Sequence, residues 1–257
     1  MGDAKVSLEE VTKAFRVDGR TMTAVDRVSL GLPSGEIVCL LGPSGCGKST
    51  LLGLIAGFAK PTRGRILVDG RPVVGPGVDR GVVFQQFVLF PWLTALENVE
   101  FGPKLQGQPR PRRAAAAMRY MEMVGLAQHA SKFPTQLSGG MKQRVAIARA
   151  LVNDPGVLLM DEPFGALDAQ TRELMQEELL RIQAMEHKTI LFVTHSIQEA
   201  LFLGDTVVVM TASPGRLKAS LPVHLAHPRD KFSPAFVERE RKIFEILREE
   251  ILKTGVR

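Results

Sequence analysis

The segment GPSGCGKST at residues 42–50 combines glycines, a lysine and hydroxyl residues at the spacing of a phosphate-binding loop. Its glycines let the backbone bend so that successive N–H groups point at phosphate oxygens. The apolar segment IVCLL precedes the loop and the helical pattern KSTLLGLIAGF follows it, so a helix dipole adds to the attraction. Lys48 would reach the β- and γ-phosphates of a nucleotide, and the Ser49 hydroxyl would ligate Mg²⁺. The candidate nucleotide-binding residues are Gly42, Pro43, Ser44, Gly45, Cys46, Gly47, Lys48, Ser49 and Thr50.

A pair of adjacent carboxylates could supply a metal ligand and a base for hydrolysis. The segment VLLMDEP at residues 157–163 is an apolar strand pattern that ends in Asp161 and Glu162. In an open α/β sheet, such a strand end lies at the edge that also carries the phosphate loop. Asp161 is expected to orient Mg²⁺ or its water shell, and Glu162 to accept a proton from the attacking water. An Asp-Glu pair that only starts a helix is the disfavoured alternative.

Two further polar residues follow strand patterns. His195 ends TILFVTH, and it could hydrogen-bond the γ-phosphate and hold the geometry of base and water. Gln85 directly follows GVVF and is long enough to reach Mg²⁺ or the water. Because Gln85 is neutral, it would sense the γ-phosphate and not act as a base. Alone, His195 would be a structural histidine and Gln85 a surface glutamine, so both assignments depend on the other motifs.

The segment LSGGMKQRVAIARAL at residues 137–151 is a second helix start suited to an anion. A serine and two glycines open an apolar helix that carries basic residues. A helix N-terminus stabilises an anion strongly only within about one turn. Taken alone, the pattern is typical of a plain helix-start turn.

Short β-branched segments without polar alternation predict strands covered on both faces, as in a parallel sheet. Helical patterns separate them, which indicates a doubly wound α/β domain. Residues 5–32 instead alternate as strands do, and GRILVDGRPVV at 64–74 predicts a hairpin that turns at Asp69-Gly70. The buried strands are predicted at 37–41, 81–84, 157–161, 189–195 and 206–210.

Two segments are predicted to be mainly helical. We expect an inserted helical subdomain at about 87–152, in which RRAAAAMRYMEMVGL forms a helix that stops at Gly125. A C-terminal extension at 221–257 follows an ATPase domain at 1–220, and its helix has Ser233 as N-cap and Pro234 in the first turn. Packing of its apolar stripe on the domain is favoured over a partner groove. The predicted stripe is Phe236, Ile243, Phe244, Leu247 and Ile251.

Composition is that of an ordinary soluble protein, with 45% hydrophobic and 23% charged residues in 257. No apolar run approaches the ~18–20 residues that span a bilayer, and the polar start MGDAKVSLEE is not expected to act as a signal peptide. Cys39 and Cys46 suggest a reducing cytosol without a disulfide, and Cys46 is interpreted as a space-filling residue. The net charge of +6 admits nucleic acid or an anionic membrane as partner, but the absence of basic blocks favours an ordinary solvated surface.

In order and spacing, these motifs resemble the ATP-binding cassette (ABC) ATPases over roughly residues 5–220. The matching segments are GPSGCGKST, VFQ at 83–85, LSGGMKQ at 137–143, LLMDEP, ALD at 166–168 and VTH at 193–195. The resemblance implies a P-loop NTPase fold with a mixed sheet core, an N-terminal antiparallel β subdomain and an inserted α-helical subdomain. It also implies hydrolysis of ATP with Mg²⁺.

The resemblance accounts for the second helix start. In this family the backbone N–H groups at Ser138, Gly139 and Gly140 cap the γ-phosphate held by another copy's phosphate loop. Two chains facing head to tail would thus enclose two ATP molecules, and loss of the γ-phosphate would remove much of the attraction that closes the dimer. The resemblance also places Asp168 in the family's D-loop and Phe15 where an aromatic ring stacks on adenine.

The sequence departs from the family pattern at three positions. Phe15 stands where tyrosine is commoner, so stacking should persist without a hydroxyl contact. Ser196 stands where many members have aspartate, and Gly165 where serine is frequent. Neither Ser196 nor Gly165 is at a phosphate-contacting position, so activity is expected.

Three classes of ATPase compete: the energising subunit of a membrane transporter, a nucleic-acid-associated cassette and a small-molecule kinase. A kinase would not need LSGGMKQ. Chromosome and repair cassettes insert long coiled coils between the phosphate loop and LSGGMKQ, which is the signature of the family. Here the interval from Gly42 to Ser138 leaves room only for the helical subdomain. Translation-associated cassettes carry two such domains in tandem. A transporter subunit without a nucleic-acid partner is therefore favoured.

Finer features resemble one group of importers. GPGVDRGVVFQ, PWLTALENVEFG, FGALDAQTRELMQ and ALFLGDTVVVMTASPGR look like the group that imports nitrate, taurine, aliphatic sulfonates, bicarbonate or related small anions and pyrimidine precursors. The expected partners are a second copy, a membrane permease and, indirectly, a periplasmic or lipoprotein solute-binding protein. The expected location is peripheral, at the cytoplasmic face of the inner membrane. The apolar cluster Phe87, Phe90, Pro91 and Trp92 could receive a coupling helix of the permease or belong to the core, and both interpretations stay open.

Overall fold

The computed structural model describes residues 4–253, and within this range the chain divides into two units. The first unit comprises the described residues up to Gly77 together with those from Thr189 onward. The second unit is Val78–Lys188. Each unit contains its own pairs of strands. Some of the predicted site residues lie in the first unit and the others lie in the second.

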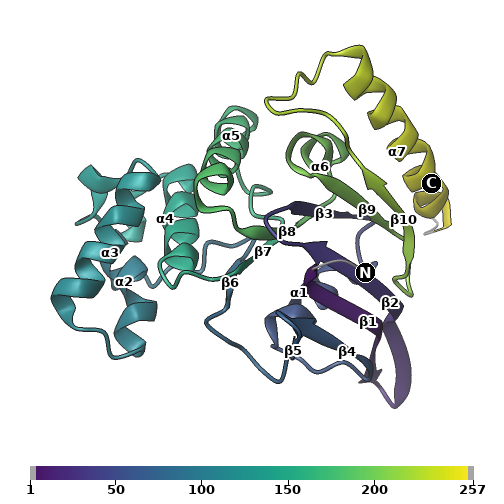
Figure 1. The fold of residues 1–257 in the computed structure, drawn as a ribbon, viewed down its shortest axis with the longest axis horizontal. Helices are drawn as coiled ribbons and strands as arrows, with labels where there is room; N and C mark the ends of the chain where they lie inside the picture. Colours follow the sequence, from purple (N-terminus) through teal and green to yellow (C-terminus); the bar gives the residue numbers. More distant parts are fainter. Residues whose placement is uncertain (1–3, 254–257) are drawn as a thin grey trace. The chain divides into compact units, whose positions relative to one another are not determined.

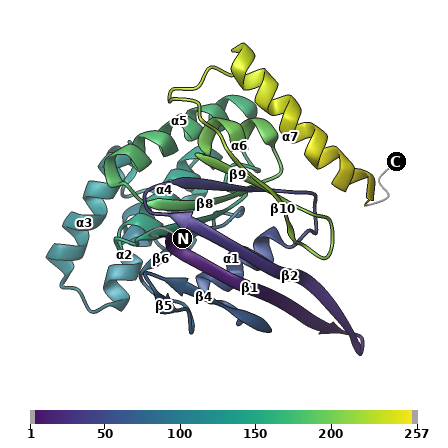
Figure 2. The same cartoon turned by 45° about the vertical axis from the view of Figure 1, so that its right-hand side comes forward.

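Four antiparallel strands form one sheet of the first unit, in the order β2-β1-β4-β5. Figure 2 shows β1 and β2 as a long two-stranded ribbon. The turn between β4 and β5 is the predicted one, since Asp69 and Gly70 have φ angles of 49° and 71°. Positive φ at both central residues is typical of a tight hairpin turn, so the Asp-Gly prediction is confirmed. The strands are β1 (Ala4–Val17), β2 (Arg20–Pro33), β4 (Arg63–Val68) and β5 (Arg71–Pro72).

A second group of strands in the first unit leads into the phosphate loop. β3 lies between β8 and β9 and is parallel to both, whereas β10 pairs antiparallel with β9, so the sheet is mixed. β3 and β8 are buried along their whole length, as expected of strands without polar alternation. The strands are β3 (Ile37–Leu41), β8 (Thr189–Thr194), β9 (Thr206–Met210) and β10 (Leu217–Pro222), and the helices of this unit are α1 (Lys48–Ala56), α6 (Ile197–Leu203) and α7 (Pro234–Lys253).

The second unit combines the parallel pair β6 and β7 with helices, of which α2, α3 and α4 pack on one another (Figure 1). A capping box begins α2, because the Thr94 side chain accepts from the Glu97 N–H and the Glu97 carboxylate accepts from the Thr94 N–H. Gly125, predicted to stop α3, has a φ of 68° just beyond its end. The elements are β6 (Arg80–Val83), α2 (Ala95–Leu105), α3 (Arg110–Met123), two 3₁₀ turns (Ala127–His129 and Pro134–Gln136), α4 (Gly139–Leu151), β7 (Val157–Asp161) and α5 (Ala169–Glu186).

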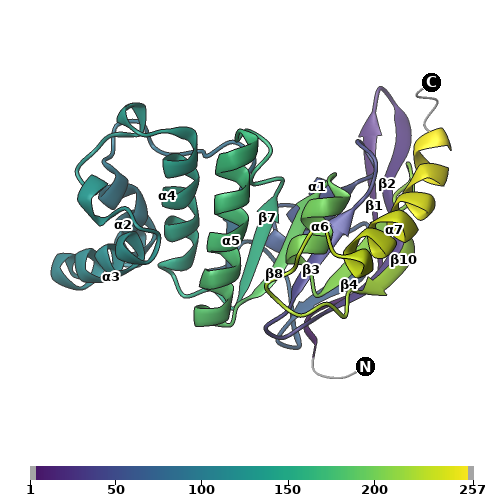
Figure 3. The same cartoon turned by 90° about the horizontal axis from the view of Figure 1, so that it is seen from above.

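The C-terminal helix α7 runs beside α6 and β10, as Figures 1 and 3 show. It starts as predicted: Pro234 is its first residue, and the Ser233 hydroxyl accepts from the Phe236 N–H at 3.4 Å. In the part of the chain that the structure describes, no helix has both the length and the apolar character needed to cross a bilayer.

The buried face of α7 differs from the predicted stripe. Three of the predicted residues are buried: Phe236, Ile243 and Leu247. Phe244 and Ile251 are 51% and 37% exposed, so their prediction was wrong. Adjacent residues lie about 100° apart around a helix, so Ile243 and Phe244 do not share one narrow contact face. Glu250 is buried instead, with 1% exposure, because hydrogen-bond donors of the first unit satisfy its carboxylate.

Candidate functional site

The phosphate loop of the first unit depends on glycine at two places. Gly45 and Gly47 have φ angles of 77° and 94°, in the left-handed region that favours glycine. At Gly47, which caps α1, a Cβ atom would also lie 2.8 Å from the carbonyl oxygen of Ala24. The start of α1 therefore lies directly against β2, and no other residue type fits there without displacing that strand.

Lys48, the first residue of α1, lies inside the loop that precedes it. Only 5% of the residue is exposed, and its Nζ donates to the carbonyl oxygens of Gly42 at 2.8 Å and Pro43 at 3.0 Å. Burial raises the pKa of the neighbouring Cys46 thiol, against the lowering influence of the Lys48 ammonium. The loop thus encloses one fixed positive charge, held by its own backbone, beside a neutral thiol.

Strand pairing brings His195 to the edge of the sheet that carries the phosphate loop. β3 and β8 are parallel, and Leu41 is opposite Thr194. Gly42 and His195 are the next residues of these two strands, so both leave the sheet at the same carboxyl edge. His195 is exposed there.

The turn that carries His195 is fixed by hydroxyl groups on either side of it. The Thr194 hydroxyl accepts from the Ser196 N–H at 3.0 Å and donates to the buried Glu199 carboxylate. Ser196 is the N-cap of α6, with its hydroxyl accepting from the Glu199 N–H at 3.3 Å. Serine and aspartate are both good N-caps, so this departure from the family pattern preserves the cap.

Phe15 lies on the ribbon that borders the phosphate loop. It is 39% exposed, and the Lys13 ammonium lies 5.1 Å from the centre of its ring. Lys13 is opposite Val25 in the β1–β2 pairing, and Val25 Cγ2 would be 3.0 Å from a Cβ atom at Gly47. The ring is therefore exposed enough for stacking. It lies two residues along β1 from Lys13, whose pairing partner Val25 on β2 approaches the loop.

In the second unit, Gln85 and the two carboxylates follow paired strand ends. β6 and β7 are parallel with Val83 opposite Met160, so Gln85, Asp161 and Glu162 lie at one edge. Glu162 has a φ of 45°, which is unusual for a residue with a side chain and recurs at functional sites.

Gly165 lies close to Gln85. A Cβ atom at Gly165 would be 3.3 Å from Gln85 Nε2, so the glycine leaves room for this amide. The departure of Gly165 from the family pattern therefore has a local structural consequence at Gln85.

The segment at 137–140 forms a capped helix start, and it lies next to the D-loop. Ser138 is the N-cap of α4, with its hydroxyl accepting from the Met141 N–H at 3.3 Å. The first N–H groups of a helix have no carbonyl partner within it, which leaves Gly139 and Gly140 with amides suited to an anion. A Cβ atom at Gly140 would lie 2.6 Å from Thr171 Cγ2, so the start of α4 packs on the first turn of α5.

Asp168 has a structural function in addition to its predicted one. It is the N-cap of α5, and its carboxylate accepts from the Thr171 N–H at 2.9 Å. This hydrogen bond is the main reason why the pKa of Asp168 lies below its usual value. The D-loop and the start of α4 are therefore both anchored at the same turn of α5.

Two residues that support the segment after Gln85 were missed in the sequence. Arg149 of α4 donates to the carbonyl oxygens of Val88 at 2.6 Å and Phe87 at 3.1 Å. Asn98 of α2 is fully buried and holds the segment that follows, since its amide accepts from the Phe90 N–H at 2.8 Å and donates to three nearby carbonyls. Arg149 lies in the helix pattern that begins at Ser138, but nothing in that pattern indicates where its side chain reaches.

The apolar cluster after Gln85 is divided between packing and surface. Phe90 lies 4.4 Å from the ring centre of Phe101 and 5.7 Å from that of Trp92. Phe87 and Phe90 are partly buried, whereas Trp92 is 70% exposed and Pro91 is exposed too. The exposed indole leaves an apolar surface on the second unit, beside a cavity of about 360 Å³ whose lining includes Trp92 and Phe101.

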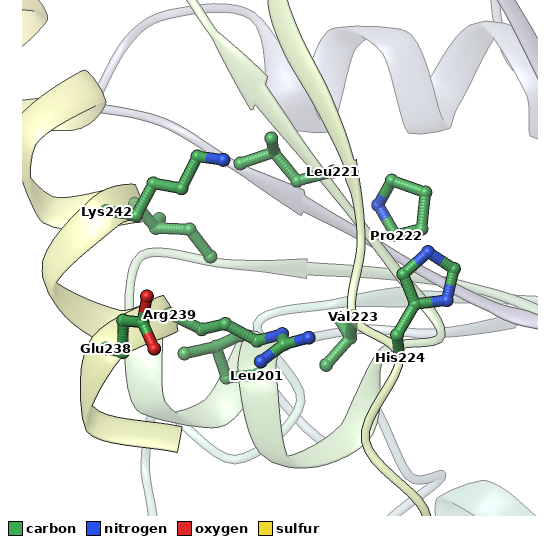
Figure 4. Close-up of a pocket in the computed structure, with 9 residues that line it drawn as sticks. Leu201, Leu221, Pro222, Val223, His224, Glu238, Arg239 and Lys242 are labelled. Atoms are coloured by element: carbon green, nitrogen blue, oxygen red, sulfur yellow. The ribbon is translucent and has the colours of Figure 1, made fainter. Parts of the chain in front are cut away.

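In the first unit, a cavity of about 300 Å³ lies at the C-terminal helix and not at the phosphate loop (Figure 4). Figure 4 shows Arg239 extending from α7 toward Val223. None of the predicted site residues lines this cavity. The residues of the candidate site thus form two sets: Phe15, the loop at 42–50 and His195 in the first unit, and Gln85, Ser138–Gly140, Asp161, Glu162 and Asp168 in the second.

Comparison with known families and proteins gives a consistent result. The family model described as "ABC transporter" matches residues 25–165. An uncharacterized ABC transporter ATP-binding protein of Methanocaldococcus jannaschii is 52% identical, over 97% of this chain and 94% of its own length. The taurine import ATP-binding protein TauB of Rhizobium johnstonii is 51% identical, over 89% and 90% of the two chains. The nitrate import ATP-binding protein NrtD of Synechocystis is 46% identical, over 93% and 91%.

Solved structures show the same fold. A dimeric bacterial ABC transporter cassette matches 86% of this chain and 100% of its own, with 36% identity and a TM-score of 0.76. A cassette of a Clostridium perfringens ABC transporter complex matches 98% and 99% of the two chains, with 29% identity and a TM-score of 0.79. The P-loop cassette fold, with its antiparallel N-terminal sheet, mixed sheet and additional helices, is therefore confirmed.

Proposed function

Because this chain belongs to the ABC transporter family as an ATP-binding subunit, we propose that it hydrolyses ATP to energise the uptake of a small solute through a separate permease. The names of its relatives support import, since two of them, similar over about nine-tenths of both chains, are import ATP-binding proteins for taurine and nitrate. We infer a solute of the same class, a small nitrate-, sulfonate- or taurine-like molecule. The nucleic-acid-associated alternative has no such support.

The phosphates of ATP bind in the glycine loop of the first unit. Backbone N–H groups at 42–50 and the Lys48 ammonium face the β- and γ-phosphates, and Phe15 stacks on the adenine. Ser49, Gln85 and Asp161 each offer a side-chain oxygen, the donor type that Mg²⁺ prefers, so these residues fit the metal that accompanies ATP. When bound, Mg²⁺ offsets the negative charge of the phosphates.

Three side chains act on the attacking water and the γ-phosphate. Glu162 accepts the proton of the water, in keeping with its place at the end of β7 beside Asp161. His195 hydrogen-bonds the γ-phosphate from the end of β8. Gln85 senses the γ-phosphate, and because a glutamine amide does not take up the proton, the base is Glu162.

A second copy completes each site. The N–H groups at Ser138, Gly139 and Gly140, with the dipole of α4, cap the γ-phosphate held by the partner copy. Asp168 lies at the same interface. The similar solved structures support this arrangement, because one is a dimeric cassette and another is a dimer in a post-hydrolysis state with ADP and Pi.

The remaining partners follow from the importer proposal. The permease docks on the inserted helical subdomain at about 87–152, with the exposed Trp92 and Pro91 as an apolar contact. The ATPase domain spans 1–220, followed by the helical extension at 221–257. The protein is peripheral at the cytoplasmic face of the inner membrane, and a periplasmic or lipoprotein solute-binding protein delivers the solute to the permease.

The observation that carries the proposal is the ammonium of Lys48, held inside the glycine loop at the edge where His195 also lies. The test is ATP binding to the purified chain by calorimetry, with Lys48→Ala compared to the wild type. The wild type should bind ATP with Mg²⁺ and hydrolyse it, and Lys48→Ala should bind at least about a hundredfold more weakly while retaining the circular dichroism of the fold. Equal ATP affinity of the two proteins would contradict the proposal.

The solute class needs a separate experiment. Co-expression with its permease and binding protein, followed by uptake of labelled taurine, alkanesulfonate and nitrate, should show transport of one of the three. Transport should stop in Lys48→Ala cells. Transport unaffected by this variant would refute the importer function even if ATP binding is confirmed.

A further inference from the structure

The segment between β9 and β10 lies directly behind the phosphate loop. A Cβ atom at Gly215 would be 2.0 Å from the carbonyl oxygen of Cys46, so the two backbones are in contact. The Gly215 N–H donates to Ala24 at 2.9 Å, and the Gly215 carbonyl accepts from the Asp26 N–H at 2.9 Å. Since Ala24 borders Gly47, this segment supports the phosphate loop both directly and through β2.

Internal hydrogen bonds make residues 211–216 a rigid turn. The Thr211 N–H donates to the Arg216 carbonyl at 2.9 Å, and the Thr211 hydroxyl accepts from the Arg216 N–H at 2.9 Å. The same hydroxyl donates to the Pro214 carbonyl at 2.9 Å. Arg216 is also paired with Asp26 of β2 at 2.5 Å. A displacement at one end of this turn therefore reaches the other end.

Glu250 of α7 holds the turn from its outer side. One carboxylate oxygen accepts from the Ala212 N–H at 3.0 Å. The other accepts from Lys218 at 2.7 Å and from Lys253 at 2.6 Å. Burial alone would raise the pKa of Glu250, but these three hydrogen bonds outweigh it and lower the pKa to about 2. A buried carboxylate with three donors is a fixed anchor.

We propose that Glu250 is a positioning residue for ATP binding, acting through the turn at 211–216 on the backbone of the phosphate loop at Cys46 and Gly47. The inference rests on the proposed nucleotide-binding function of that loop. Glu250 touches neither nucleotide nor reacting atoms. It fixes the turn that lies behind the phosphate loop, so that the N–H groups of the loop are aligned before ATP binds. This alignment lowers the free-energy cost of ordering the loop when ATP binds.

Glu249 provides a matched control for Glu250. It is the preceding residue of α7, it is 69% exposed, and it accepts from the same Lys218 at 2.5 Å. It does not accept from the Ala212 N–H, which donates to Glu250. Glu249→Gln and Glu250→Gln remove the same charge from the same helix. A glutamine at 250 keeps only one acceptor oxygen, so it cannot accept from both the Ala212 N–H and the two lysines, whereas Glu249→Gln leaves all three hydrogen bonds of Glu250 in place.

The experiment measures ATP dissociation constants, KM and kcat for the full-length chain. Glu250→Gln should raise Kd and KM about tenfold and change kcat less than about twofold, whereas Glu249→Gln should match the wild type in all three. Equal Kd values for the two variants would overturn the inference. A fall in kcat without a rise in KM would overturn it too, because a positioning effect on binding appears in KM.

Two further variants separate positioning from stability. Leu247→Ala weakens the packing of α7 but removes none of the hydrogen bonds of this path, so it should lower Tm and leave Kd within about twofold. A tenfold rise in Kd for Leu247→Ala would refute a specific role of Glu250. Gly215→Ala alters the turn without touching α7, and it should raise Kd even if Glu250→Gln does not fold. Unchanged Kd in Gly215→Ala would also refute the inference.

The proposed function and this inference fail in distinguishable ways. If the wild type does not bind ATP, or if Lys48→Ala binds as well as the wild type, the proposed function fails. If Lys48→Ala loses ATP binding while Glu250→Gln and Gly215→Ala keep wild-type affinity, only the positioning role fails.

Discussion

Arg149 Nη1 donates a 2.6 Å hydrogen bond to the carbonyl oxygen of Val88, joining α4, the helix capped by Ser138, to the segment that follows Gln85. Val88 has a φ of 45°, a conformation that needs such external support. The second hydrogen bond, to Phe87, means that one guanidinium fixes two successive carbonyls. The apolar surface around Trp92 and the signature helix are thus linked by one side chain.

The substitution Arg149→Ala should destabilise the second unit by about 1–3 kcal/mol, because it leaves two carbonyls without their donor. Urea unfolding measures the loss, and hydrogen exchange should quicken at residues 86–94. Lys142→Ala, on the same helix, is the control and should stay within about 0.5 kcal/mol of the wild type. If Lys142→Ala lost stability and Arg149→Ala did not, the contacts of Arg149 would not be important for the second unit.

The substitution Glu162→Gln keeps the shape of the side chain and removes its ability to accept a proton. We expect ATP binding to persist, kcat to fall about 10²- to 10⁴-fold, and an ATP-bound dimer to accumulate. Size-exclusion chromatography with ATP and Mg²⁺ detects the dimer, and the same variant without ATP is the control. A monomer in the presence of saturating ATP would count against a site completed by a second copy.

The substitution Ser196→Ala removes the cap of α6 beside His195, whereas Ser196→Asp should retain it. The alanine variant should lose about 1 kcal/mol, which corresponds to a fall in Tm of about 2–4 °C, and the aspartate variant should match the wild type. Thermal unfolding followed by circular dichroism distinguishes them. Equal Tm values for the serine and alanine proteins would show that the cap contributes nothing.

The stability contributed by Glu250 should depend on pH in a defined window. Its pKa is lowered from 4.5 to about 2 in the folded protein, so the charged form is stabilised by folding. This stability is fully present above about pH 4.5 and is lost as the pH falls toward 2. The free energy of unfolding of the wild type should therefore exceed that of Glu250→Gln at neutral pH, and the gap should shrink below about pH 4.5.

Urea unfolding at a series of pH values measures this gap. The groups that face the carboxylate are the ammonium groups of Lys218 and Lys253. For Glu249→Gln the corresponding gap should be smaller, because Glu249 is exposed and its pairing with Lys218 is screened by water. A gap for Glu250→Gln that does not change with pH would mean that its carboxylate is not held in the charged form.

The sequence predicted those parts of the site whose conformation is determined by residues adjacent in the chain. The strand, glycine loop and helix at 37–56 follow from one motif, and the turn at Asp69-Gly70 follows from the φ angles that those residues tolerate. The end of β8 before His195, the helix start that follows Ser138 and the cap Ser233 were likewise visible, since signals for a helix start act within one turn. The roles assigned to these side chains remain predictions.

Contacts between distant segments could not be predicted in this way. The apolar pattern of α7 does not reveal that Phe244 faces water or that Glu250 is buried, because two of the three partners of Glu250, Ala212 and Lys218, lie outside this helix. Gly215 lies in the segment ALFLGDTVVVMTASPGR, and nothing in that segment indicates that the missing side chain of Gly215 lets two backbones touch. The pattern of apolar residues along one helix or strand shows which of its faces are apolar. It does not show which distant segments of the chain pack against those faces.

The position of β3 between β8 and β9 bears on how the protein is made. Both neighbours of β3 are encoded more than half the chain later, and so is Gly215, which backs the phosphate loop. A nascent chain on the ribosome therefore exposes IVCLL and the glycine loop long before either strand partner exists. The native contacts of β3 and of the phosphate loop can therefore form only late in synthesis, and until then this apolar segment has no native strand partner to cover it.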